Sequence, residues 1–227
     1  MRVNLKQQLG QGVGYFVVFA LALFVPAGTL NWPAGWLFLF LFFAFYAALQ
    51  AWLAQHNPSL LQERSRLWTA DQKGWDKWLY PVLLLIPLFW LAIMALDVVR
   101  FHWSRLPFWL QMVGAILLLG SFFLFFLTFR ENSYLSTVVR IQKERGHTVI
   151  SSGPYHFVRH PMYSGILLFV VATALLLGSG YGLLLGLFYI GVLARRAILE
   201  ERTLQVELPG YAAYTTQVRY RFVPHLW

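Results

Sequence analysis

Cysteine is absent from the 227 residues, and charged side chains are scarce. The absence of cysteine excludes disulfides, thiolate metal sites and cysteine nucleophiles. Only 12% of the residues are charged, 59% are hydrophobic, and the mean hydropathy is +0.58. A soluble domain of this length could not bury so much apolar surface, so the composition indicates an integral membrane protein. The length suits one compact bundle, and no internal repeat is evident.

Six apolar segments fill most of the chain, and each approaches the roughly 20 residues that a helix needs to cross a bilayer. They cover residues 11–30, 32–55, 77–97, 107–129, 161–178 and 181–199. The sequence therefore predicts an all-α, polytopic membrane bundle of about six helices. The first segment follows Arg2 and Lys6 and lacks a small-residue cleavage site, so we expect a retained helix rather than a signal peptide.

Basic residues are distributed unevenly among the connections. If the N-terminus is cytoplasmic, all but two of the 18 Lys and Arg residues fall on the cytoplasmic side, the exceptions being Arg100 and Arg105. This bias predicts that both termini are cytoplasmic. The net charge of +9 then reflects topology and contact with anionic lipid rather than nucleic-acid binding.

Residues 200–227 are polar but carry apolar side chains at spaced positions. These are Leu204, Leu208, Tyr211, Tyr214, Val218 and Phe222. The spacing predicts a C-terminal amphipathic helix that lies against the membrane face or caps the bundle. The whole chain, 1–227, is expected to be a single membrane-embedded domain. Its helices one to four would occupy 1–129, and 130–227 would hold the long loop, a helical hairpin and the C-terminal helix.

One segment, Gly153-Pro-Tyr-His-Phe-Val-Arg-His-Pro-Met-Tyr-Ser-Gly165, places several polar groups against an apolar run. Such groups are costly near hydrocarbon unless something is paired or bound there. Pro161 suits the first turn of a helix, so His160 and Tyr163 would lie at the helix mouth with Arg159 beside them. The alternative is an ordinary helix start in which Arg159 reaches lipid phosphate and Tyr163 belongs to an interfacial belt.

An acidic pair, Glu200-Glu201, follows Arg195-Arg196 at the inner end of the last apolar run. Arg196 and Glu200 are four residues apart and can share a helix face, either as an interfacial ion pair or as contacts to a ligand. Adjacent glutamates point about 100° apart on a helix, so only one of them is expected to face a ligand.

His156 and His160 are also four apart, but the turn between them and the residue before proline argue against a shared helical face. No third ligand has a matching spacing, so no metal site is expected. In the long loop, Asn132, Tyr134, Arg140 and Gln142 could close over a ligand, although we favour the simpler interpretation that they solvate the loop.

The pattern Gly153-Pro-Tyr-x-x-x-Arg-His-Pro-x-Tyr-x-Gly165, followed by Glu200-Glu201-x-x-Leu204 and Tyr211-x-x-Tyr214, resembles the isoprenylcysteine carboxyl methyltransferase family. The wider group includes phospholipid N-methyltransferases. The resemblance covers roughly residues 130–227, where the loop also resembles bacterial members, whereas the first four helices carry no diagnostic motif. Departures at Gly210-Tyr211 and Arg219-Tyr-Arg221 bear on the acceptor more than on the cofactor.

This resemblance implies a membrane methyltransferase that uses S-adenosyl-L-methionine without a Rossmann fold. Carried over by position, the cofactor-binding residues would be Gly153, Pro154, Tyr155, His160, Pro161, Tyr163, Glu200 and Glu201. Arg159 and Arg196 would orient the acceptor, with Arg195 as the alternative to Arg196. The active site would face the cytoplasm from a bacterial inner membrane.

The expected reaction is carboxyl O-methylation of a lipophilic, prenyl-like small molecule. Membrane lipids are the other expected partners, with no nucleic acid and no metal. Three alternatives stay open at this point. They are a phospholipid N-methyltransferase, a nicotinamide-dependent sterol-type reductase and a non-enzymatic membrane protein.

Overall fold

The computed structural model describes residues 5–66 and 68–227, and the side chains of residues 10–66 and 68–227. Arg2, which was used above to orient the chain, lies outside the described residues. The secondary structure consists of α1 (Leu5–Ala27), α2 (Pro33–His56), α3 (Pro58–Arg64), α4 (Gly74–Ala95), the π-helix η1 (Leu96–Arg100), α5 (Phe108–Glu131), the short 3-10 helices η2 (Lys143–Arg145) and η3 (Gly153–His156), α6 (Pro161–Leu177), α7 (Gly180–Glu207) and α8 (Tyr211–Gln217).

The predicted polytopic, all-α bundle is confirmed. Within the residues that the structure describes, five helical spans are long and apolar enough to cross a membrane, namely α1 from Gly10, α2, α4 continued by η1, α5 and α7. The predicted segment 161–178, the fifth in the chain, forms α6, which has 17 residues because Pro161 begins it and Gly178 ends it in a left-handed conformation. The helix α7 continues to Glu207, so the acidic pair lies inside a helix rather than beyond its end.

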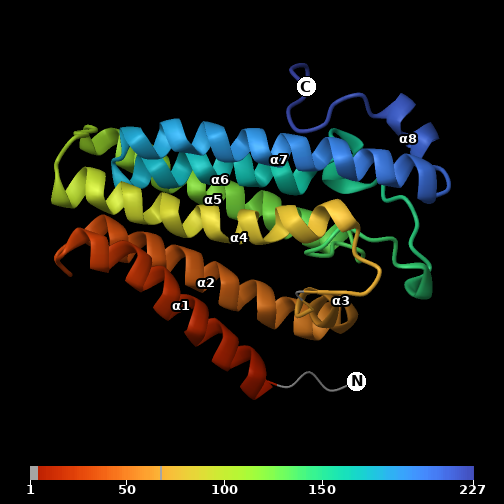
Figure 1. The fold of residues 1–227 in the computed structure, drawn as a ribbon, viewed down its shortest axis with the longest axis horizontal. Helices are drawn as coiled ribbons and strands as arrows, with labels where there is room; N and C mark the ends of the chain where they lie inside the picture. Colours follow the sequence, from red (N-terminus) through yellow and green to blue (C-terminus); the bar gives the residue numbers. More distant parts are fainter. Residues whose placement is uncertain (1–4, 67) are drawn as a thin grey trace.

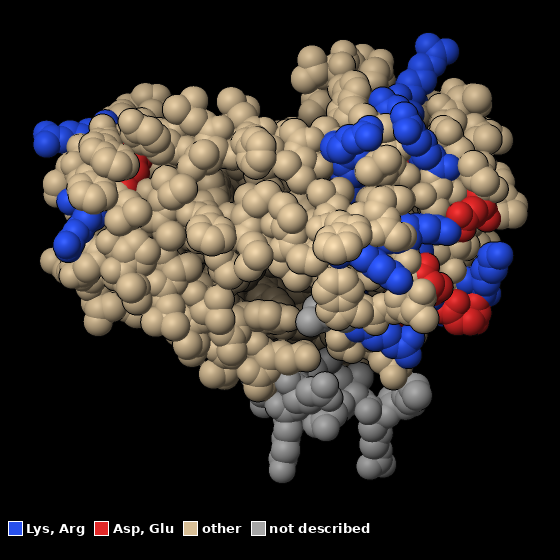
Figure 2. Space-filling model, in the orientation of Figure 1, with Lys and Arg blue, Asp and Glu red and all other residues tan. Residues whose placement is uncertain are grey.

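The four helices α4 to α7 run side by side along the long axis of the molecule, while α1 and α2 form an oblique hairpin (Figure 1). This hairpin lies close to α4 at one end of the bundle and diverges from it towards the other. The second end also carries α3, the loop between α5 and α6, and α8. Charged side chains gather at the two ends, with a largely uncharged band between them (Figure 2). That distribution suits a membrane-spanning bundle.

The closest packing in the bundle is between α5 and α6. A β-carbon added to Gly114 would lie 2.3 Å from the backbone nitrogen of Leu176 and 2.8 Å from the carbonyl oxygen of Ala172. Small residues allow such close backbone approach between membrane helices. Aromatic rings fill the neighbouring core, and those of Phe45 and Phe122 stack with centroids 4.6 Å apart. The contact with α5 fixes the position of α6, which carries the polar motif at its start.

The C-terminal helix is shorter than the spacing over 200–227 suggests. Pro209 and Gly210 separate α7 from α8, and Gly210 adopts a φ of 85° that favours glycine. After seven residues α8 ends, and the remaining chain is irregular. The spaced apolar residues cap the bundle, because Leu208, Tyr211, Tyr214 and Val218 pack against the long loop.

We expect Gly114→Ala to destabilise the bundle by about 1–3 kcal/mol, since its methyl group would overlap the backbone of α6. The matched control is Gly120→Ala on the same helix, where the new β-carbon would lie 3.7 Å from the Leu168 side chain, an ordinary contact. Thermal unfolding in detergent, followed by circular dichroism, measures both variants. Equal melting temperatures for the two would contradict the close approach of α5 and α6.

Candidate functional site

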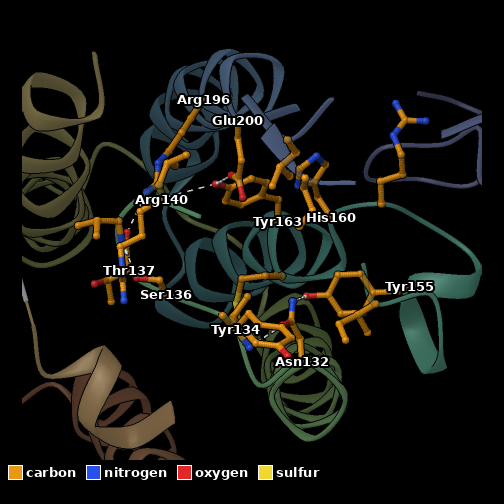
Figure 3. A pocket seen from close by; sticks show the side chains of 18 of the residues that line it. Asn132, Tyr134, Ser136, Thr137, Arg140, Tyr155, His160, Tyr163, Arg196 and Glu200 are labelled. Atoms are coloured by element: carbon orange, nitrogen blue, oxygen red, sulfur yellow. Dashed lines mark hydrogen bonds between the residues drawn. The ribbon is translucent and has the colours of Figure 1, made fainter. Parts of the chain in front are cut away.

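A cavity of about 370 Å³ lies at the bundle end that carries the long loop (Figure 3). Its walls come from α3, α4, residues 132–150, η3, α6, α7 and α8. The volume falls within the range of roughly 300–1,000 Å³ that is usual for small-molecule sites. Six of the ten predicted site residues line it, which are Tyr155, Arg159, His160, Tyr163, Arg196 and Glu200.

The start of α6 is held by the C-terminal segment. The backbone nitrogens of Arg159 and His160 donate to the carbonyl oxygens of Tyr220 and Arg221, both at 2.9 Å. Pro161 then occupies the first helical position, where its missing N–H leaves no bond unmade. These contacts fix the direction in which the His160 side chain leaves the helix.

Glu201 is buried behind the cavity and is 3% exposed. One of its carboxylate oxygens accepts from Arg159 Nε at 2.6 Å and lies 3.2 Å from His160 Nε2. The other oxygen accepts from Arg221 Nε at 2.8 Å. A single carboxylate therefore joins the start of α6, the C-terminal part of α7 and the C-terminal segment.

Glu200 faces the cavity, whereas Glu201 does not line it. The hydroxyl of Tyr163 donates to Glu200 Oε2 at 2.7 Å and accepts from Arg196 Nη1 at 3.3 Å. The ring of His160 stacks on that of Tyr163, with centroids 5.4 Å apart. Of the two adjacent glutamates, Glu200 is therefore the one placed to meet a molecule in the cavity, and its contact with a ligand stays a prediction.

Arg196 lines the cavity, while Arg195 is exposed and does not. Arg196 Nε donates to Asp76 Oδ1 at 3.0 Å, and Nη2 donates to the carbonyl oxygen of Thr137 at 2.8 Å. Asp76 is fully buried, and its other oxygen accepts from the backbone nitrogen of Val139 at 2.8 Å. Sequence reasoning missed Asp76, although an acidic residue in the first turn of an apolar helix is a recognisable signal.

The long loop is anchored rather than solvated, so the interpretation favoured above was wrong for two of its residues. Arg140 and Gln142 are buried. Arg140 donates to both oxygens of Glu63 at 2.9 and 3.0 Å and to Asp71 at 2.7 Å. The hydrogen bonds that Arg140 donates to Glu63 raise the pKa of Arg140 above its ordinary value, against the effect of burial. The partners are about 70 residues away in the chain, so the local sequence could not reveal these contacts.

Asn132 and Tyr134, at the start of the same loop, line the cavity. Asn132 donates from its amide to the Tyr155 hydroxyl at 2.7 Å, and the Tyr214 hydroxyl donates to the Tyr155 carbonyl oxygen at 2.6 Å. Burial raises the pKa of Tyr155 above its ordinary range, so this hydroxyl stays neutral. The polar end of the cavity is thus also strongly aromatic.

Three predicted cofactor residues, Gly153, Pro154 and Pro161, lie outside the lining of the cavity. Gly153 has a φ of 56°, and a β-carbon there would lie 2.4 Å from Cγ of Glu131. Its lack of a side chain therefore serves the turn and the close approach of α5. A direct cofactor contact for these three residues stays a prediction from the resemblance alone.

One part of the cavity wall is apolar and comes from α4, α6 and α7; we call this part, Leu83, Leu84, Ile166 and Leu193, the apolar arm. Leu84 follows Asp76 by eight residues, which corresponds to about 12 Å along the helix. Leu84 is also 48% exposed on the outside of the bundle. The arm therefore reaches into the membrane-spanning part of α4, where an apolar ligand could lie.

The two histidines of the motif are separated in space. His156 is exposed and lines a shallow surface depression with Phe157 and Tyr220, whereas His160 points into the main cavity. Within residues 5–66 and 68–227, no group of three His, Cys, Asp or Glu side chains is arranged to hold a metal ion.

His147, in the long loop, also lines the cavity and stacks on Tyr134 with ring centroids 4.5 Å apart. Burial lowers the pKa of His147 to about 4, with the charges of Arg145 and Arg140 as further causes. The ring is therefore neutral at pH 7. Because the folded chain disfavours the protonated ring, its stability is expected to fall at acid pH.

Glu201→Gln should lower the stability of the protein by about 3–5 kcal/mol, because it leaves Arg159 and Arg221 without their buried counter-ion. The matched control is Glu207→Gln, which removes the same charge from an exposed pair with Lys73 and is expected to change stability by about 1 kcal/mol or less. Melting temperatures in detergent compare the two, and a control as damaging as Glu201→Gln would refute the role of the buried cluster.

The melting temperature should fall as the pH falls from 6.5 to about 4, and by less in His147→Phe than in the wild type. The unfolded chain binds a proton at a pKa near 6.5 but the folded chain only near 4. Stability from neutral His147 is therefore complete above pH 6.5 and is lost as the pH falls through this window. Phenylalanine keeps the stack on Tyr134, so parallel melting curves for both proteins would argue against a buried neutral histidine.

Comparison with known families supports methyl transfer. A family model described as phospholipid methyltransferase matches residues 109–207, which include α5, the long loop, the polar start of α6 and the acidic pair in α7. A search among curated proteins found no match. The family match covers the segments that supply most of the cavity's polar end, and it supports a membrane methyltransferase.

Proposed function

We propose that the protein is an S-adenosyl-L-methionine-dependent methyltransferase that O-methylates a carboxylate on a lipophilic, prenyl-like molecule. The observation that carries this proposal is one cavity with a polar, aromatic end beside Glu200 and an apolar arm along α4. The family match supports the methyl transfer. The resemblance of the Gly153–Gly165 motif to isoprenylcysteine carboxyl methyltransferases supports the carboxylate acceptor.

The residues at the polar end fit the cofactor. Glu200 has no basic nitrogen within 4.0 Å among the described residues, and its Oε1 has no hydrogen-bond partner there. A carboxylate that faces a cavity in this way suits a cationic or hydroxyl-rich ligand, and the cofactor has both an ammonium group and ribose hydroxyls. Tyr134, Tyr155 and Tyr163 supply aromatic faces for a base. When bound, the cofactor supplies a methyl group on a cationic sulfonium.

The protein would promote the reaction by positioning and by excluding water. A carboxylate acceptor needs no general base, because it is already deprotonated at neutral pH. Attack on a sulfonium neutralises two opposite charges, and water stabilises those charges when they are separate. A dry pocket that aligns the reactants therefore favours the transition state. Here the long loop, anchored by Arg140, covers the cavity from the charged end of the bundle.

The two predicted catalytic arginines would then have different roles. Arg196 lines the cavity beside Tyr163, and we assign it to orienting the acceptor. Arg159 donates its Nε to Glu201 and its Nη1 to the carbonyl oxygens of Val218 and Arg219, at 2.8 and 2.7 Å. We assign Arg159 mainly to positioning, since these bonds hold the start of α6 against the C-terminal segment.

Phospholipid N-methylation is the second candidate, because the matching family model is described as phospholipid methyltransferase. An ammonium acceptor must first lose a proton. His147 lines the cavity, but its lowered pKa makes it a weak base at pH 7. Lipids labelled by a radioactive methyl donor separate the two reactions, since a methyl ester releases methanol in alkali and an N-methyl group does not. The family match favours both over a nicotinamide-dependent reductase or a non-enzymatic protein.

Glu200→Gln should weaken binding of S-adenosylhomocysteine by about tenfold or more, because it removes the charge that faces the cavity. Its effect on melting temperature should be much smaller than that of Glu201→Gln, since Glu200 has no counter-ion within 4.0 Å in the described structure. Calorimetry measures the affinity, with Glu207→Gln as the control. Failure of the folded wild-type protein to bind S-adenosylhomocysteine would end the proposal.

A further inference from the structure

Four arginines line the cavity, and three of them have a carboxylate partner. The pairs are Arg140–Glu63, Arg159–Glu201 and Arg196–Asp76. Arg64, the last residue of α3, has no carboxylate within 4.0 Å among residues 5–66 and 68–227. It is the cavity arginine whose charge the described part of the chain does not balance.

The protein uses little of the hydrogen-bonding capacity of Arg64. Its Nη1 donates to the carbonyl oxygen of Leu135 at 3.1 Å, and its guanidinium carbon lies 4.7 Å from the centre of the Phe129 ring. A guanidinium carries five N–H donors, so most of them are available to a ligand. The planar arrangement of these donors suits the two oxygens of a carboxylate or phosphate.

The surroundings of Arg64 favour an anion. Burial lowers the pKa of Arg64 to about 10, opposed by the nearby hydroxyl of Tyr80 and assisted by the positive charge of Arg196. The side chain is nevertheless cationic at neutral pH. A partly buried cation without a counter-ion is unfavourable, and a bound oxyanion would compensate that cost.

The position of Arg64 also suits an amphiphile. The helix α3 lies where the α1–α2 hairpin diverges from α4 (Figure 1), and the arm of the cavity runs along Leu83 and Leu84 of α4. A molecule with an anionic group at Arg64 could therefore place its apolar tail in the membrane-spanning part of the bundle. This arrangement differs from that at Glu200, which suits a cation.

We infer that Arg64 is the docking residue for the oxyanion of the acceptor, a carboxylate or phosphate at the head of a lipid-like molecule whose tail follows the apolar arm. The inference deepens the proposed function and rests on it. It assigns substrate recognition to α3, an element outside both the motif-bearing segment and the matched residues 109–207.

The test uses the full chain in detergent micelles, loaded with S-adenosylhomocysteine. Calorimetry measures the affinity for farnesylthioacetic acid and for its uncharged primary amide. Arg64→Gln should weaken binding of the acid on the order of 10- to 100-fold and leave binding of the amide unchanged. Arg64→Lys should restore part of the loss, because it keeps the charge but not the planar fork.

Two controls separate recognition from folding. Arg202→Gln removes a cation from an exposed position on α7 and should bind the acid like the wild type. Binding of S-adenosylhomocysteine should be the same in Arg64→Gln and the wild type. An equal loss for acid and amide would show that Arg64 only supports the structure through Phe129 and Leu135, and would overturn the inference.

The remaining outcomes distinguish the two proposals. If the wild type binds S-adenosylhomocysteine but Arg64→Gln binds the acid normally, the inference about Arg64 fails unless the charge dependence appears with a phospholipid. Binding of dioleoyl phosphatidylethanolamine, compared with that of uncharged dioleoylglycerol, tests this case. If Arg64→Gln weakens binding of the phospholipid alone, phosphate is the anion. If the wild type does not bind S-adenosylhomocysteine at all, the proposed function itself is wrong.

Discussion

The arrangement at the charged end of the bundle depends on one buried carboxylate. Glu201 accepts from Arg159 and Arg221 and contacts His160, and so joins the start of α6, the C-terminal part of α7 and the C-terminal segment. A carboxylate that is 3% exposed is stable only when such partners compensate its lost hydration. Because α5 packs closely along α6, this ionic cluster also sets where the motif lies relative to the rest of the bundle.

Neighbouring glutamates on one helix consequently take different tasks. The offset of about 100° between adjacent residues turns Glu200 towards the cavity when Glu201 is buried against Arg159. The hydrogen bond from Tyr163 on α6 to Glu200 on α7 then joins these two helices at the cavity. The residue that forms the buried ion pairs, Glu201, and the residue whose charge faces the cavity, Glu200, are thus neighbours in the chain. Substituting Glu201 should mainly lower stability, and substituting Glu200 should mainly weaken ligand binding.

The sequence predicted the features that depend on local pattern. Apolar length located the long helices, and the Gly153–Gly165 motif contains residues that line the cavity at the mouth of α6. Pairings across the chain could not be predicted in this way. Arg140 pairs with Glu63, which is 77 residues away in the chain, and Arg196 pairs with Asp76, which is 120 residues away. Spacing within one helix contains no information on such contacts, so the sequence favours a solvated loop and does not distinguish Arg64 from the other basic residues of its connection.

Two charged groups of opposite sign line the cavity without a direct ion-pair partner in the described structure. Glu200 and Arg64 both line the cavity, and neither has an oppositely charged partner within 4.0 Å. In the proposed reaction a cationic methyl donor meets an anionic acceptor, and each loses its charge as the methyl group is transferred. A site that offers one free charge to each reactant can bind both while remaining close to neutral overall. Its other arginines are already compensated by carboxylates, so they add geometry and not excess charge.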